Sequence, residues 1–184
     1  METKEVIRKE TIRRLQDQDP HLREERSLSI QKKLLSNEGF EVARTVMIYV
    51  SLPTEVNTGY FIKKALERGK KVVVPYIEPN SNTIIATELK TIEDLEKGPL
   101  GIYQPKEGLK DKIPIGEIDL LVVPAIAYDK SNMRLGRGKG YYDRFLSRVE
   151  LNSVKTIGVA FNFQIIDYLP RDPHDKPVSL VITD

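Results

Sequence analysis

The segment IDLLVVP, from Ile118 to Pro124, is the clearest predicted strand of this sequence, because a short run of Leu and Val ends there at a proline. A glycine-rich segment and a predicted helix at residues 141–149 follow it. Further strands are predicted on both sides of this unit, at residues 45–51, 71–76, 82–89, 156–160 and 178–182.

Helices are predicted between these strands. Residues 4–16 carry a thin apolar stripe, and Asp19-Pro20 supplies an N-cap and a first-turn proline for a helix that ends near residues 37–39. Thr58 can cap a third helix that stops at Gly69. Strands that alternate with helices predict an α/β three-layer sandwich, Rossmann-like, with a mostly parallel central sheet flanked by helices. We expect a single domain over residues 1–184, with a loop at residues 98–114 and its ligand beyond the carboxyl ends of the strands.

The composition excludes several classes of chemistry. The 184 residues include no cysteine and only two histidines, which excludes disulfides, thiolate catalysis and histidine-rich metal sites. The first 14 residues are densely charged and resemble no signal peptide, and no apolar run is long enough to cross a membrane. We therefore expect a cytoplasmic protein with no membrane partner.

Positive charge is concentrated in one stretch. Residues 130–148 contain six basic residues and one acid, Asp143, whereas the whole chain has a net charge of only +2. A local concentration of this kind suits a phosphorylated small molecule better than a long polyanion.

The core of that stretch is RLGRGKGYYDR, from Arg134 to Arg144. Three glycines at a spacing of two allow backbone amides to approach an anion closely, and the three cations Arg134, Arg137 and Lys139 add formal charge. The pattern predicts a phosphate-binding loop, although a flexible basic loop is the alternative. It is neither a P-loop, which requires Ser or Thr after Gly-Lys, nor a dinucleotide fingerprint, which requires glycine where Tyr141 stands.

The motif, placed after a Leu-Val-Val-Pro strand and Asp129, resembles the signature of the 5-formyltetrahydrofolate cyclo-ligase family. Three more features are similar to that family: an N-terminal Lys4-x-x-x-Arg8 pair, Glu55 beyond the first strand, and the late pair His174-Asp175. The resemblance implies a ligase that forms a carbon–nitrogen bond in a ring, converting 5-formyltetrahydrofolate and ATP, with Mg²⁺, into 5,10-methenyltetrahydrofolate, ADP and phosphate.

The resemblance also implies roles for individual residues. ATP is bound by Lys4, Arg8, Arg134, Leu135, Gly136, Arg137, Gly138, Lys139, Gly140, Tyr141 and Tyr142. Lys139, Arg134 and Tyr141 assist catalysis, and Val50, Glu55 and Tyr141 bind folate. Mg²⁺ is held by the carboxylates of Asp143 and Asp175. The expected partners are these small molecules alone, with no nucleic acid, and the expected state is a monomer.

Other interpretations remain open at this point. One is a sugar-phosphate isomerase or an acyl-CoA transferase-like enzyme on a similar sheet. Another is a single-stranded RNA-binding module that uses Tyr103, Tyr141 and Tyr142 with neighbouring cations. Taken singly, Lys4 and Arg8 could be solvated, and Tyr142 could belong to the core.

Overall fold

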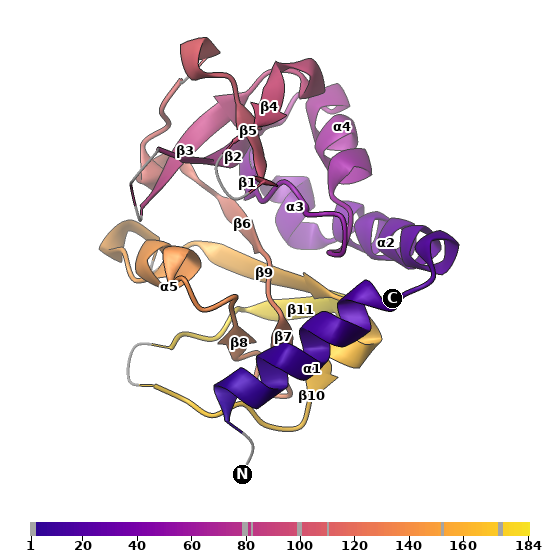
Figure 1. Cartoon of the computed structure of the whole chain (residues 1–184). Coiled ribbons are helices and arrows are strands. Elements are labelled where there is room, and N and C mark those ends of the chain that lie inside the picture. Colours follow the sequence, from indigo (N-terminus) through magenta and orange to yellow (C-terminus); the bar gives the residue numbers. More distant parts are fainter. Residues whose placement is uncertain are drawn as a thin grey trace.

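A six-stranded sheet in the order β11-β9-β6-β1-β2-β3 forms the centre of the molecule (Figure 1). The computed structural model describes residues 3–78, 81, 83–98, 101–109, 111–151, 153–172 and 175–184. The sheet strands are β1 (Thr45–Ile48), β2 (Lys71–Ile77), β3 (Ile84–Leu89), β6 (Leu120–Val123), β9 (Lys155–Ala160) and β11 (Leu180–Thr183). The helices are α1 (Lys4–Gln16), α2 (Pro20–Leu35), α3 (Glu38–Val42), α4 (Gly59–Glu67) and α5 (Tyr141–Leu146).

Five of the six strands are parallel, and only the edge strand β3 runs antiparallel, against β2. The parallel strands, numbered along the chain, lie in the order 2-1-3-4-5, which is a common doubly wound arrangement. The chain leaves the middle of this sheet in opposite directions after β1 and after β6. Such a switch point opens a crevice at the carboxyl ends of the two strands. The predicted α/β sandwich with a mostly parallel sheet is confirmed.

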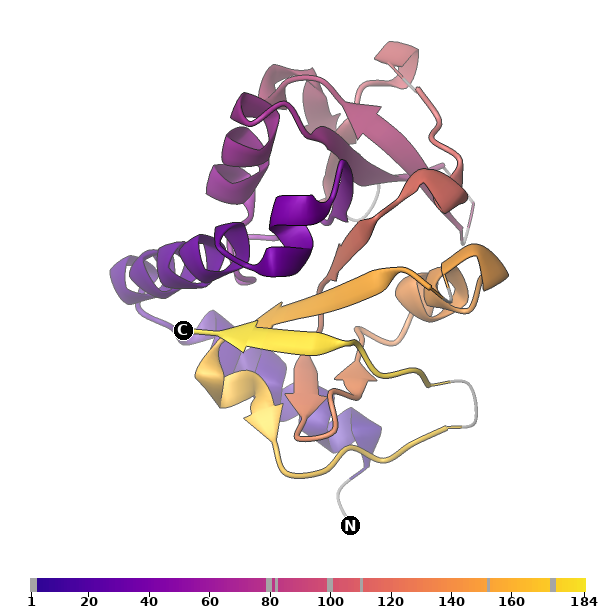
Figure 2. The same cartoon turned by 180° about the vertical axis from the view of Figure 1, so that it is seen from behind.

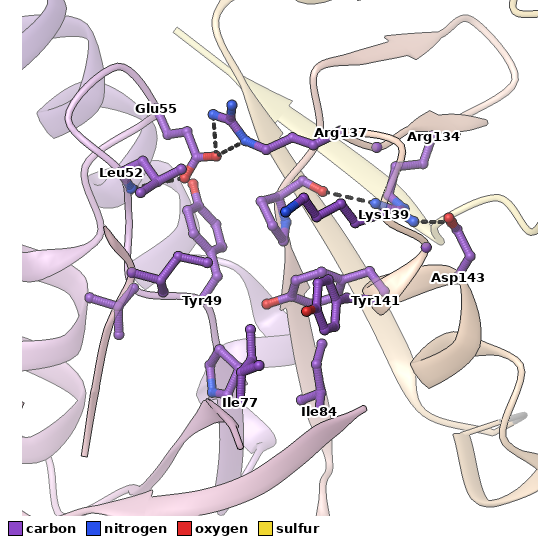
Figure 3. A pocket seen from close by; sticks show the side chains of 18 residues that line it. Tyr49, Leu52, Glu55, Ile77, Ile84, Arg134, Arg137, Lys139, Tyr141 and Asp143 are labelled. Carbon is purple, nitrogen blue, oxygen red and sulfur yellow. Dashed lines mark hydrogen bonds and ion pairs between the residues drawn. The ribbon is translucent and has the colours of Figure 1, made fainter. Parts of the chain in front are cut away.

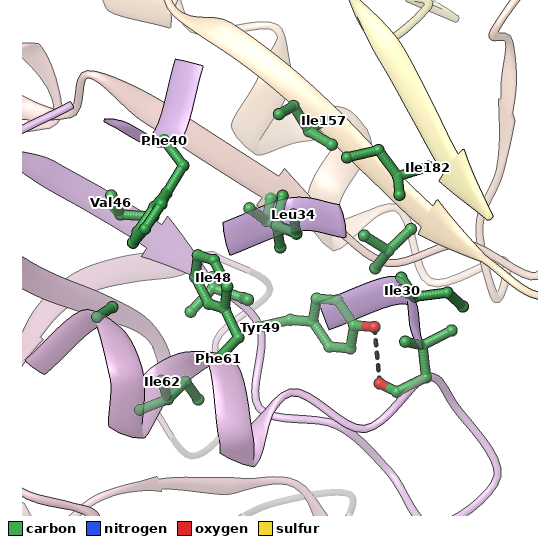
Figure 4. Packing of buried hydrophobic residues seen from close by; sticks show 14 of the residues in the cluster. Ile30, Leu34, Phe40, Val46, Ile48, Tyr49, Phe61, Ile62, Ile157 and Ile182 are labelled. Carbon is green, nitrogen blue, oxygen red and sulfur yellow. Dashed lines mark hydrogen bonds between the residues drawn. The ribbon is translucent and has the colours of Figure 1, made fainter. Parts of the chain in front are cut away.

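Each face of the sheet buries alternate residues of the same strands. Val46 and Ile48 of β1 belong to one apolar cluster with Leu34, Phe40 and Phe61 of α2, α3 and α4 (Figure 4). The intervening Met47 belongs to a second cluster, on the other face, which includes Phe145 of α5. Because both faces are covered, the strands are almost continuously apolar, as parallel strands usually are.

The helix signals in the sequence are mostly confirmed. The side chain of Asp19 accepts a hydrogen bond from the Leu22 amide at 2.9 Å, and Pro20 begins α2. Asn37 does not end that helix region but caps a short new helix, α3, through the Gly39 amide. Thr58 precedes α4 without capping it, because its hydroxyl donates to the Tyr49 carbonyl instead, at 3.0 Å.

A second sheet, in the order β10-β7-β8, was not predicted. It consists of β7 (Ala127–Asp129), β8 (Arg134–Leu135) and β10 (Ile165–Ile166). Strands of two or three residues have too little pattern to be recognised. Helix α1 lies against this small sheet, and Ile7, Ala127, Met133, Leu135 and Leu169 form a third apolar cluster there (Figures 1 and 2).

Several predicted boundaries were wrong. The expected loop at residues 98–114 contains β5 (Tyr103–Pro105), which pairs with β4 (Leu95–Lys97). The Gln104 side chain fixes this hairpin to the sheet by bonding both backbone groups of Ile77. The last helix ends at Leu146 instead of residue 149, and Ser147 then leads towards a 3-10 turn, Val149–Leu151. Asn82, the expected start of β3, and His174 lie outside the described residues.

No helix within the described ranges is long and apolar enough to cross a membrane.

Gly158 allows β9 to pack against Tyr128, and this close approach gives a stability prediction. A Cβ atom at residue 158 would lie 2.4 Å from the ring of Tyr128, which is fully buried. We expect Gly158→Ala to lower the free energy of unfolding by about 1–3 kcal/mol, the range for overpacking. Urea unfolding would measure this. Gly108→Ala, where an added Cβ meets nothing within 4 Å, is the control; equal effects of the two substitutions would contradict the packing argument.

Candidate active site

A cavity of about 360 Å³ lies at the switch point between β1 and β6 (Figure 3). Its walls come from segments that follow these two strands, from the glycine-rich loop and from the edge of β2 and β3. The lining residues are Tyr49, Val50, Leu52, Glu55, Pro75, Ile77, Ile84, Ile102, Pro124, Ala125, Arg134, Gly136, Arg137, Lys139, Gly140, Tyr141, Tyr142 and Asp143. The cavity therefore lies where the sheet topology predicts a ligand site.

One wall is the segment after β1. The Tyr49 hydroxyl donates to the Val56 carbonyl at 2.9 Å, which closes the segment into a loop. Burial raises the pKa of Tyr49, and the charge of Glu55 raises it further, so the phenol stays protonated. Within the loop, Oε2 of Glu55 accepts a hydrogen bond from the Leu52 amide at 2.9 Å. The carboxylate is thus held in a fixed position at the cavity.

The opposite wall is the glycine-rich loop between β8 and α5. Arg134 is buried, donates to the Pro124 carbonyl at 3.3 Å and forms an ion pair with Asp143. Gly140, which precedes α5, has a φ of 69°, a conformation that side chains rarely adopt. A Cβ there would also lie 2.7 Å from the Arg144 guanidinium. The glycine lets the loop turn sharply into α5 and keeps Lys139 and Tyr141 at the cavity.

A salt bridge joins the two walls. The Arg137 guanidinium contacts Oε1 of Glu55 with its NH2 group at 2.8 Å and its Nε atom at 3.1 Å (Figure 3). The two residues are 82 positions apart, so no local pattern in the sequence could indicate this contact. It places the residue expected to bind folate against one expected to bind ATP.

Helix α1 approaches the glycine-rich loop from outside the cavity. Nε of Arg8 donates to the Gly136 carbonyl at 2.9 Å, and the Lys4 ammonium contacts Asp172 at 2.6 Å and Asp175 at 2.5 Å. Partial burial alone would lower the pKa of Lys4, but its hydrogen bonds to both acids raise it. Lys4 and Arg8 are therefore not simply solvated, although neither lines the cavity.

The two acids predicted to bind Mg²⁺ share a cation. Arg134 forms an ion pair with Asp143, and its charge also acts on Asp175. Burial alone would raise the pKa of Asp175, but hydrogen bonds from Lys4 and the Asp172 amide, with the charges of Lys4 and Arg134, lower it. Mg²⁺ in nucleotide enzymes commonly uses one or two carboxylates together with phosphate oxygens. Two carboxylates that both interact with the charge of Arg134, an arginine that could also bind phosphate, fit such a site. Among the described residues, no group of three or more His, Cys, Asp or Glu side chains is placed to hold a metal ion.

Most of the predicted site residues come together. Val50, Glu55, Arg134, Gly136, Arg137, Lys139, Gly140, Tyr141, Tyr142 and Asp143 line the cavity, whereas Lys4, Arg8, Leu135, Gly138 and Asp175 do not. Leu135 is buried in the cluster under α1, and its side chain does not line the cavity.

The apolar floor of the cavity was not predicted. It includes Pro75, Ile77, Ile84, Ile102 and Pro124. Pro75 and Pro124 stand at the ends of predicted strands. Because ligands of such sheets bind beyond the carboxyl ends of the strands, this position could have indicated that both prolines line the cavity. Tyr103 is 49% exposed outside the cavity, whereas Tyr141 and Tyr142 lie within it, so the three tyrosines form no shared stacking surface for RNA.

Comparison with known proteins identifies the family. A sequence model of the 5-formyltetrahydrofolate cyclo-ligase family matches residues 1–184. The chain is 33% identical to a 5-formyltetrahydrofolate cyclo-ligase of Mus musculus, over 97% of this chain and 92% of that protein. The solved structure of 5,10-methenyltetrahydrofolate synthetase from Aquifex aeolicus superposes with a TM-score of 0.85 at 30% identity, over 98% of this chain and 89% of that one.

A synthetase of the same name from Mycoplasma pneumoniae shares the fold, with a TM-score of 0.78 at 24% identity over 98% of each chain. The match over the full sequence and the agreement in fold lead to one conclusion. This chain is an enzyme of the 5-formyltetrahydrofolate cyclo-ligase family.

Proposed function

We propose that this enzyme closes the formyl group of 5-formyltetrahydrofolate into 5,10-methenyltetrahydrofolate, with Mg²⁺ and ATP consumed to ADP and phosphate. The observation on which the proposal rests is the composition of the cavity. One side presents a fixed carboxylate and an apolar floor, and the other presents Arg134, Arg137 and Lys139 on a glycine-rich loop. A planar, partly apolar folate suits the first side, and a phosphate chain suits the second.

The reaction requires the protein to position the two substrates and to stabilise the charge that develops on the transferred phosphoryl group. The formyl oxygen is a poor leaving group until it is phosphorylated. Nitrogen 10 of the same substrate then attacks the formyl carbon and releases its proton to solvent, and the oxygen leaves as part of phosphate. Both reacting nitrogens belong to the substrate, so the enzyme needs no nucleophile of its own, which agrees with a chain that has no cysteine. Cations near the transferred phosphoryl group stabilise its developing charge.

The residues divide accordingly. Lys139 lines the cavity, and among the described residues its ammonium has no ion-pair partner, so we assign it with Arg134 to the transferred phosphate. Asp143 and Asp175 would hold Mg²⁺, which would neutralise phosphate charge. Glu55 and Val50 would hold the folate, with Tyr141 beside its ring. Arg8 and Lys4 would act from α1, where they support the loop and the acid Asp175.

The reaction itself is the first test. The purified protein should convert 5-formyltetrahydrofolate to a product with the absorbance of methenyltetrahydrofolate only when Mg²⁺ and ATP are both present. Heavy oxygen placed in the formyl group should appear in inorganic phosphate, because that oxygen leaves with the phosphoryl group. Label found in water, with unlabelled phosphate, would rule out this route even if the conversion occurred.

Glu55→Gln should weaken folate binding selectively. The substitution keeps an oxygen for the Leu52 amide but removes the charge that we assign to the folate. A charged hydrogen bond of about 1.5–3 kcal/mol corresponds to a loss of roughly ten- to a hundredfold in folate affinity. Equilibrium titrations of each substrate would measure it, with Glu24→Gln, an exposed acid bonded to Asn57, as the control. A similar loss for ATP would argue against the assignment.

Asp143→Asn should still fold, with some loss of stability because buried Arg134 loses its charged partner, and it should lose most of its turnover at low Mg²⁺. The change is isosteric and removes one of the two proposed metal-ligand charges. Steady-state rates measured across a range of Mg²⁺ should show at least a tenfold loss at low Mg²⁺ and partial recovery at high Mg²⁺, as expected when about 1.4 kcal/mol or more is lost. Asp172→Asn, which changes a mostly exposed acid that contacts Lys4 and not Arg134, is the matched control. Wild-type rates at low Mg²⁺ would remove Asp143 from the metal site.

A further inference from the structure

Three residues that line the cavity, Val50, Leu52 and Glu55, belong to the loop that joins β1 to α4. Between Ile48 and Gly59 the chain forms no helix and no strand, so the shape of this loop depends on individual hydrogen bonds. Loops held by few such bonds are usually more mobile than the elements they connect. The position of the Glu55 carboxylate in the cavity therefore depends on the bonds that hold the loop.

Two of these bonds lie within the loop. The Glu55 amide donates to the Leu52 carbonyl at 3.0 Å, and the Leu52 amide donates to Oε2 of Glu55 at 2.9 Å (Figure 3). They fix the turn at residues 52–55 but do not attach that turn to the rest of the protein. The attachment has to come from the two ends of the loop.

The hydroxyl of Thr58 joins these two ends. It donates to the Tyr49 carbonyl at 3.0 Å and accepts a hydrogen bond from the Ser51 amide at 3.2 Å. Thr58 is 2% exposed and directly precedes α4, which is anchored in the apolar core by the buried ring of Phe61. A side chain at the start of a packed helix thus holds the backbone on both sides of Val50.

Tyr49 also connects the ends of the loop, because its hydroxyl donates to the Val56 carbonyl at 2.9 Å. Tyr49 lines the cavity, however, so a substitution there would also change the surface that a ligand contacts. Thr58 is not among the lining residues. Any effect of its hydroxyl on a bound ligand must therefore pass through the loop.

We infer that Thr58 is a positioning residue for the folate: its hydroxyl fixes the loop that places the Glu55 carboxylate in the cavity. The inference rests on the proposed function, because it uses the assignment of Glu55 to the folate. Without the hydroxyl, the segment from Tyr49 to Ser51 loses these bonds to the start of α4, and the ligand has to order the loop when it binds. Such ordering reduces affinity, whereas a loop that is already fixed preserves it.

The first test removes the hydroxyl and keeps the shape of the side chain. Thr58→Val should lower the affinity for 5-formyltetrahydrofolate about two- to tenfold, the equivalent of one neutral hydrogen bond. The affinity for ATP should not fall, because the cations assigned to phosphate lie on the opposite wall. Thr58→Ala, which also lacks the hydroxyl, should show the same selective loss, and Thr58→Ser, which keeps it, should bind folate like the wild type.

Thr156→Val is the matched control. Thr156, in β9, is also buried, its hydroxyl accepts a hydrogen bond from the Ser179 amide at 2.9 Å, and it does not line the cavity. This substitution should lower stability towards urea and leave both affinities unchanged. Loss of stability alone is thereby separated from loss of folate binding.

A double-mutant cycle tests whether Thr58 acts through Glu55. In a Glu55→Gln background, most of the effect of Thr58→Val on folate affinity should disappear, because the charge that the loop positions is gone. Binding is measured by titration calorimetry on the full-length protein, with 5-formyltetrahydrofolate and ATP as separate probes.

Three results would be decisive against these expectations. If the effects of Thr58→Val and Glu55→Gln add in full, Thr58 does not act through Glu55, and the inference is wrong. If Thr58→Val keeps wild-type folate affinity, or loses folate and ATP affinity equally, the hydroxyl has only a structural role, and the inference is again wrong while the proposed function stands. If the wild-type protein binds no 5-formyltetrahydrofolate, the proposed function itself fails.

Discussion

The active-site loop depends on the buried carboxylate of Asp129, which is only 2% exposed. Its Oδ1 atom accepts hydrogen bonds from the amides of Ser131 and Met133 at 2.8 and 3.1 Å, and its Oδ2 atom accepts one from the Leu169 amide at 3.1 Å. A buried carboxylate without such donors would be strongly unfavourable, so the backbone must fold around it. The three bonds close the turn between β7 and β8 and attach the later segment around residue 169. That turn places Arg134 at the cavity. The segment held by the Leu169 amide continues along the chain towards Asp175.

Much of this architecture was predictable because its causes are local. The apolar runs predicted the five parallel strands, Asp19 with Pro20 predicted the start of α2, and the run from Arg134 to Asp143 predicted most of one cavity wall. These signals depend on residues close together in the sequence. The family resemblance added Glu55, which no spacing argument could have related to that loop.

The remaining features depend on contacts between distant segments. The turn around Asp129 includes Asn132 at a φ of 61°, and β8 has only two residues, so neither leaves a periodic pattern. The Glu55–Arg137 bridge and the Lys4–Asp175 pair join segments 82 and 171 positions apart. Residue type was also ambiguous for Asn37, which can end one helix or begin another with equal ease. Such contacts exist only in the folded protein, where side chains from several elements lie together.

The salt bridge between Glu55 and Arg137 has a consequence for how the two substrates meet in the enzyme. In the ligand-free protein, each residue neutralises the other. The first ligand to bind must therefore separate them, and the free energy of that separation reduces its affinity. The second ligand finds its own partner already released. On the proposed assignment, folate and ATP would therefore bind with positive cooperativity, and thermodynamic linkage would require each to tighten the other by the same factor. Each substrate would then bind somewhat more weakly alone than in the ternary complex.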